Sequence, residues 1–111
     1  MQSPEHFFRA LSDPTRLRCL LLLLSEQQVC VCEFVHALGL SQPRVSRHLA
    51  QLRDMEIVCD ERRGQWVYYR LNPELPQWAR ETLEAVFQAE AMSTVRQRLA
   101  SMPNRPSVSC D

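Results

Sequence analysis

The stretch that most limits the possible folds is LGLSQPRVSRHLAQL, residues 38–52. Gly39 is typical of the position just after a helix, where glycine adopts a left-handed backbone at little cost. Ser41 is a favoured N-cap residue, and Pro43 is tolerated in the first turn that follows. Apolar residues then recur at helical spacing, as Val45, Leu49 and Leu52. The pattern predicts two helices joined by a short glycine-containing turn, which is a helix-turn-helix.

Further helices are expected on both sides of this motif. Asp13 as N-cap, with proline directly after it, predicts a helix that runs to about residue 24. A shorter helix before it would carry three apolar residues on one face, namely Phe7, Phe8 and Leu11. A long amphipathic helix is predicted over about residues 77–102. Terminal helices with apolar surface to spare indicate a homodimer.

Two strands are predicted at residues 57–59 and 66–71, and Gly64 supplies the turn between them. The predicted fold is therefore mainly α with a small β component (α+β). It is a winged helix-turn-helix with a two-stranded β-wing and with N- and C-terminal dimerisation helices. Residues 1–102 form one domain of this kind, and residues 103–111 are expected to be a disordered tail.

The helix after Ser41 has the surface of an element that enters the major groove. Its outward positions combine Arg with small polar residues, which suits contacts to guanine, adenine and phosphate. The whole chain has no net charge, but residues 41–72 hold six Arg against four acidic residues. An ordinary solvated helix face is the simpler alternative, and His48 is expected to be a partly buried structural residue. The predicted DNA contacts are Gln42, Arg44, Ser46, Arg47 and Gln51 on the helix, with Arg62 and Arg63 at the wing tip.

The composition and the apolar pattern of the chain indicate its cellular compartment and the chemistry of its cysteines. The chain opens without a basic start followed by an apolar run, and its longest apolar stretch is too short to span a bilayer. A cytoplasmic location without membrane contact is the expectation. Five cysteines in a reducing compartment favour thiol chemistry or metal binding over a disulfide framework. Cys19 and Cys59 are expected in the core, because each lies in an apolar segment.

The closely spaced pair Cys30 and Cys32 is the candidate site. In an extended segment both side chains point the same way, whereas residues two apart in a helix diverge by about 200°. The pair is therefore predicted to be extended, just before a helix that begins at Glu33. A helix N-terminus should lower the pKa of the thiols. Two thiolates suit a soft metal ion, and helix formation at these residues would compete with metal binding.

The motifs LSDPTRLRCLLLL, CVCE, LGLSQPRVSRHLAQLR and GQWVYYRL together resemble the ArsR/SmtB family of metal-sensing winged-helix repressors, in its arsenical-responsive branch. The resemblance covers about residues 7–99. It implies a homodimer that represses an arsenic-resistance operon and leaves operator DNA when trivalent arsenic or antimony binds. It further implies that Cys30 and Cys32 are the sensing residues, that 42–52 is the recognition helix, and that no cofactor is needed beyond the metalloid effector.

Arsenical repressors of this family often carry a third cysteine three residues after the pair, where this chain has Val35. A third sulfur could come from Cys110, because the residues after Ser101 could reach up to about 30 Å. Water or a cellular thiol could complete the site instead.

The same residues leave other functions open. A thiol redox or persulfide sensor, or a cadmium- or lead-responsive repressor, would keep the fold and change the signal. An enzyme is not expected, because no cysteine has Arg at the spacing of a phosphatase-like oxyanion loop, and no nucleotide-binding loop is present.

Overall fold

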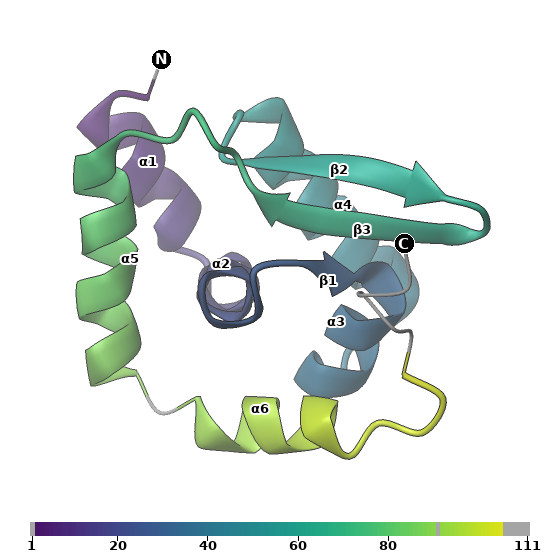
Figure 1. Cartoon of the computed structure of the whole chain (residues 1–111). Helices are drawn as coiled ribbons and strands as arrows, with labels where there is room; N and C mark the ends of the chain where they lie inside the picture. The colour runs from purple at the N-terminus through teal and green to yellow at the C-terminus, as the bar shows by residue number, and fades with distance from the viewer. Residues whose placement is uncertain (1, 91, 106–111) are drawn as a thin grey trace.

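The computed structural model describes residues 2–90 and 92–105 (Figure 1). Six helices and three strands lie in these ranges, and a helix-turn-helix precedes a β-hairpin. The predicted winged helix-turn-helix is therefore confirmed. The elements in chain order are α1 Pro4–Leu11, α2 Pro14–Glu26, β1 Val29–Cys30, α3 Val31–Leu38, α4 Gln42–Asp54, β2 Val58–Arg63, β3 Trp66–Leu71, α5 Gln77–Ala89 and α6 Ser93–Ala100.

Helix α2 begins at the capping residue that the sequence indicates. The Asp13 carboxylate accepts the backbone N–H of Arg16 at 3.0 Å, and this bond is the main reason that the pKa of Asp13 is lowered. Phe7 is buried, as expected. Phe8 is not on the same face, because 51% of its surface is exposed. The prediction of one apolar face with both phenylalanines was wrong, since adjacent residues on a helix point in different directions.

The helix-turn-helix follows the local signals closely. Gly39 ends α3 with φ of 67°, in the left-handed region that glycine tolerates. Ser41 is the N-cap of α4, and its extended backbone starts the helix without a side-chain capping bond. The inward stripe of α4 is fully buried, as Val45, Leu49 and Leu52. Helix α4 thus packs its apolar face on the core and leaves the opposite face open.

The sheet contains one more strand than the sequence predicts. Its order is β1-β3-β2 with antiparallel pairing throughout. Strands β2 and β3 form the predicted hairpin, and Gly64 in its turn has φ of 61°. Strand β1 pairs Cys30 with Tyr68 of β3. This short strand attaches the start of α3 to the base of the wing.

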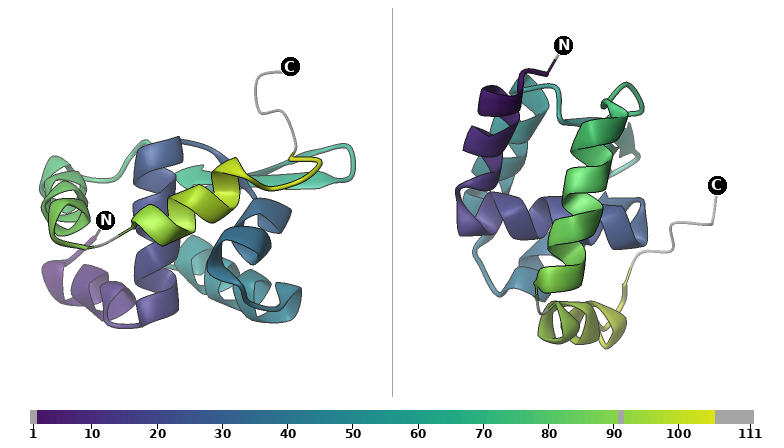
Figure 2. Two further views of the ribbon diagram at one scale, coloured as in Figure 1. Left: turned by 90° about the horizontal axis from the view of Figure 1, so that it is seen from below. Right: turned by 90° about the vertical axis from the view of Figure 1, so that its left-hand side faces the viewer.

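The C-terminal region is two helices instead of one. The predicted helix over 77–102 was wrong, because Glu90 leaves the helical conformation with φ of −90° and ψ of 134°. Met92 then packs into the core and α6 starts at Ser93. The change of direction lays α6 against α3 (Figure 2), where Arg98 Nη1 donates to the Ala37 carbonyl at 3.5 Å. Among the described residues, no helix is long and apolar enough to cross a membrane.

Candidate thiol site and nucleic-acid interface

Cys30 and Cys32 meet at the first turn of α3. Cys30 closes β1 and is the N-cap of α3, with an extended backbone at φ of −78° and ψ of 151°. Cys32 already belongs to the helix, so the prediction of an extended segment through Cys32 was wrong. The two sulfurs nevertheless lie 3.4 Å apart, because an N-cap side chain folds over the turn that follows it. Helix formation and the meeting of the thiols are therefore compatible.

The distance between the sulfurs suits a shared ligand. Two Sγ atoms bonded to one thiophilic ion at about 2.3 Å each can be at most about 4.6 Å apart. The observed separation of 3.4 Å falls within this limit. Cys30 is 1% exposed and Cys32 is half-buried. The spacing of the two sulfurs therefore suits one shared soft ion.

The protonation of Cys32 differs from the expectation. Burial, the hydrogen bond to Cys30 and the negative charges of Cys30 and Glu33 raise the pKa of its thiol to about 12. The predicted lowering by the helix N-terminus was therefore wrong for this residue. A thiol with such a pKa is protonated at neutral pH and must lose its proton when a ligand binds.

Glu33 supports the cysteine pair from inside the protein. Its carboxylate is fully buried, and Oε1 accepts the backbone N–H of Cys30 at 2.7 Å. Oε2 accepts a hydrogen bond from Arg105 Nε, and Arg105 Nη2 lies 3.3 Å from Glu26 Oε1. Sequence reasoning missed this arrangement, although an acid three residues after an N-cap is the signal of a capping box.

A cavity of about 480 Å³ joins the cysteine pair to the surface that is predicted to contact DNA. Helices α3 and α4 and the wing hairpin line it, and these elements lie next to one another in Figure 1. Residues predicted to sense the ligand and residues predicted to contact DNA therefore line one hollow. Its lining residues are Cys30, Val31, Cys32, Gln42, Ser46, Arg53, Asp60, Arg62, Gln65, Trp66, Val67 and Tyr69.

The outward face of α4 carries most of the predicted DNA contacts. Arg44 and Arg47 are exposed, and Gln42 Nε2 donates to Ser46 Oγ at 3.2 Å. Gln51 is also exposed, but its Oε1 accepts a hydrogen bond from Arg16 Nη1 at 3.2 Å. Gln51 therefore also ties α4 to α2.

The two wing arginines have different surroundings. Arg62 is exposed near the turn, and its Nη1 donates to the Gly64 carbonyl at 3.3 Å. Arg63 is half-buried, with its guanidinium 5.1 Å from the centre of the Tyr68 ring and Nη2 at 3.4 Å from Gln28 Oε1. Arg62 is thus the wing arginine that is more open to DNA.

The remaining cysteines differ in burial. Cys19 is in the core as predicted, and burial raises the pKa of its thiol to about 12. Cys59 is only half-buried and lies outside the core, so that prediction was wrong. Cys110 lies outside the described residues. Within residues 2–90 and 92–105, no three His, Cys, Asp or Glu side chains gather as a metal site.

His48 is partly buried, as predicted. Its side chain is 15% exposed, and Nδ1 lies 3.8 Å from the Asp13 carboxylate. This contact places His48 between α4 and the start of α2, which is a structural position.

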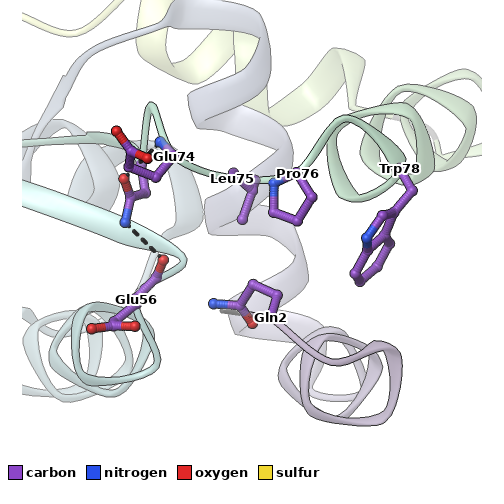
Figure 3. Close-up of a pocket in the computed structure, with 7 residues that line it drawn as sticks. Gln2, Glu56, Glu74, Leu75, Pro76 and Trp78 are labelled. Atoms are coloured by element: carbon purple, nitrogen blue, oxygen red, sulfur yellow. Dashed lines mark hydrogen bonds between the residues drawn. The ribbon is translucent and has the colours of Figure 1, made fainter.

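A second cavity lies between the N-terminal segment and the start of α5 (Figure 3). Its volume is about 450 Å³, and Gln2, Glu56 and Trp78 are among its lining residues. The side chain of Asn72 donates to the Glu56 carbonyl at 3.0 Å across one edge. No residue that lines it also lines the thiol cavity.

The fold and the open face of α4 define a winged-helix DNA-binding regulator. A sequence profile described as bacterial regulatory protein, arsR family, matches residues 13–59. Arsenic resistance transcriptional regulator ArsR1 of Pseudomonas putida KT2440 is 53% identical, over 94% of this chain and 83% of its own. Regulator ArsR2 of the same organism is 50% identical, over 99% of this chain and 100% of its own. The chain belongs to the arsR family of bacterial regulatory proteins.

Solved structures agree with this assignment. Reduced HlyU from Vibrio cholerae N16961 is similar with a TM-score of 0.70 and 28% identity, over 78% of this chain and 87% of its own. The AntR antimony-specific transcriptional repressor has a TM-score of 0.65 and 27% identity, over 82% of this chain and 78% of its own. The resemblance inferred from the motifs is confirmed.

Proposed function

We propose that this protein is a transcriptional repressor of an arsenic-resistance operon that responds to trivalent arsenic or antimony. It binds operator DNA as a homodimer in the bacterial cytoplasm and leaves it when the metalloid bonds Cys30 and Cys32. The role is binding and release, with no catalysed reaction. The observation that carries the proposal is the pair of sulfurs 3.4 Å apart, in a cavity shared with the reading helix and the wing. The names of the relatives support the same effector class.

Ligand binding at the thiols can alter DNA binding through residues that lie close to both sites. Gln42 and Ser46 on α4, and Arg62 on the wing, line the cavity beside the thiols. Two bonds from one arsenic or antimony atom would draw the sulfurs toward it and shift the first turn of α3. Helix α3 packs directly on α4, so the reading helix and the wing would move out of their common alignment. Such coupling requires a difference in DNA affinity between the free and the liganded states.

The homodimer proposal rests on the terminal helices. Phe8 of α1 is 51% exposed, and Val86 and Phe87 of α5 are only partly buried. Apolar side chains of this kind are favourable at a subunit interface. A second copy would also double the number of arginines that face phosphates, which strengthens binding at low salt.

Titration of the operator complex with different effectors tests the proposed function. Reduced protein on fluorescent operator DNA would receive arsenite, antimonite, cadmium, zinc and an oxidant in separate experiments. Release by arsenite and antimonite in preference to the others supports the proposal. Release only by the oxidant would instead indicate a redox or persulfide sensor, and release only by cadmium would indicate a divalent-cation sensor.

The response to pH should separate the metalloid from divalent cations. The Cys32 thiol is protonated at neutral pH, because its pKa is raised to about 12. Arsenous acid uses each thiol proton to release water, so its affinity should change little from about pH 6 to 8. A divalent cation must displace the Cys32 proton, so its affinity should rise with pH, by about tenfold per unit for that thiol.

Half-release concentrations of arsenite and cadmium, measured at several pH values and referred to operator affinity without effector, check this expectation. The expectation would be contradicted if the half-release concentration of arsenite fell with rising pH as strongly as that of cadmium.

We also propose Cys110 as the third sulfur donor. It lies five residues after Arg105, and five extended residues span at most about 18 Å. Cys110→Ser should then raise the arsenite concentration needed for release by about tenfold, which corresponds to about 1.4 kcal/mol. X-ray absorption should show the number of As–S bonds fall from three to two, while Cys59→Ser changes neither quantity. An unaltered spectrum in Cys110→Ser would assign the third position to water or to a cellular thiol.

A further inference from the structure

The buried carboxylate beside the thiols depends on the far end of the chain. Glu33 is 0% exposed, and its charge-bearing partner in the described chain is Arg105, 72 residues later. Arg105 belongs to the segment that follows α6, and that segment is drawn in yellow at the end of the coloured trace in Figure 2. The same guanidinium lies 3.3 Å from Glu26 at the end of α2. One side chain thus joins α2, α3 and the C-terminal segment.

The contact between Glu33 and Arg105 affects the thiols because the other carboxylate oxygen of Glu33 binds the backbone of Cys30. Glu33 Oε1 accepts the Cys30 backbone N–H at 2.7 Å, which sets the orientation of the N-cap residue. A buried carboxylate without its cationic partner is strongly destabilised. Without Arg105, Glu33 would therefore turn toward solvent and release the Cys30 amide. The spacing of the two sulfurs would then no longer be held.

We propose that Arg105 is a positioning residue for the metalloid site, acting on Cys30 through Glu33. The C-terminal segment docks on α3 by this contact, and its docking and ligand binding stabilise each other, as linkage requires. This inference rests on the proposed function for the identity of the effector. The dependence of Cys30 and Cys32 reactivity on the guanidinium of Arg105 can be tested separately from that function.

The chain offers a matched control for the test. Arg96 of α6 also approaches Glu26, with Nε 3.9 Å from Oε2, whereas the guanidinium that pairs with Glu33 belongs to Arg105. Arg96→Ala therefore removes a neighbouring positive charge and leaves the pair that holds Cys30 in place. Arg105→Lys keeps the charge, and Glu33→Gln removes the buried charge that requires it.

The first measurement is the rate at which iodoacetamide alkylates the pair, in full-length protein with serine at the other three cysteines. We expect faster alkylation in Arg105→Ala, partial return to the original rate in Arg105→Lys, and no change in Arg96→Ala. In a Glu33→Gln background, Arg105→Ala should have a smaller effect. A general loss of stability would not give this pattern of rescue. Equal rates in Arg105→Ala and Arg96→Ala would overturn the inference.

The second measurement is arsenite-induced release of operator DNA, in the native cysteine background. Arg105→Ala should need about tenfold more arsenite than the unaltered protein, as for other residues that orient metal ligands, with operator affinity unchanged when arsenite is absent. An equal arsenite requirement in the two proteins would also overturn the inference. If the unaltered protein itself fails to respond to arsenite, the proposed function is wrong, and alkylation alone decides the role of Arg105.

Discussion

Replacing both Cys30 and Cys32 with serine should abolish arsenite-induced release of operator DNA. Serine is close in size to cysteine, but its hydroxyl is a hard ligand that does not replace a thiolate on a soft ion. Operator affinity without arsenite should stay within about twofold, because neither side chain holds a structural bond that serine cannot make. Fluorescence anisotropy of labelled operator DNA, titrated with arsenite in the presence of a reductant, measures both quantities.

Cys59→Ser is the control for this double substitution. Cys59 is half-buried in the wing strand β2 and takes no part in the thiol cavity. Its replacement should leave the arsenite response intact. A double variant that still releases DNA at the arsenite concentrations that act on the unaltered protein would refute the assignment of these residues as ligands.

Removal of the arginines on the open face of α4 should abolish tight operator binding. Arg44 and Arg47 are exposed there. Truncation of each arginine to alanine should cost about 1–3 kcal/mol, so the double alanine variant should bind at least about 25-fold more weakly. If an arginine binds phosphate, the dependence of log affinity on log salt should flatten by about one unit for that arginine.

Arg18→Ala supplies the comparison, because Arg18 is exposed on α2 and carries the same charge. It should lower affinity far less than Arg44→Ala or Arg47→Ala. Circular dichroism should show an unchanged fold in all three variants. Equal losses of affinity from Arg18 and the α4 arginines would mean that α4 does not read the operator.

Local signals explain why the helix-turn-helix could be predicted well. Gly39, Ser41 and the buried stripe of α4 act within a few residues of one another, so their meaning depends little on distant parts of the chain. The break between α5 and α6 carries no such signal, since neither glycine nor proline marks it. It forms because Met92 is buried and α6 packs on α3. Tertiary packing of this kind overrides helical periodicity.

The proximity of Cys30 and Cys32 was predicted correctly, whereas the predicted extended conformation was wrong. Spacing alone indicated the pair, because only residue types and separation were needed. It could not reveal that Cys30 caps a helix containing Cys32, since strand pairing with Tyr68 decides where β1 ends. The link between Glu33 and Arg105 spans 72 residues. No periodic pattern reports a contact over that separation.

Cys30 is at once the last residue of β1 and the N-cap of α3. Opposite it in the sheet stands Tyr68, which is paired on its other side with Glu61 of β2. If residues 29–34 alone were grafted onto another scaffold to build a biosensor, the two sulfurs would lose the strand pairing and the ion pair that position them. The β2-β3 hairpin, and the Arg105 side chain that binds the capping carboxylate of Glu33, would have to be transferred with them.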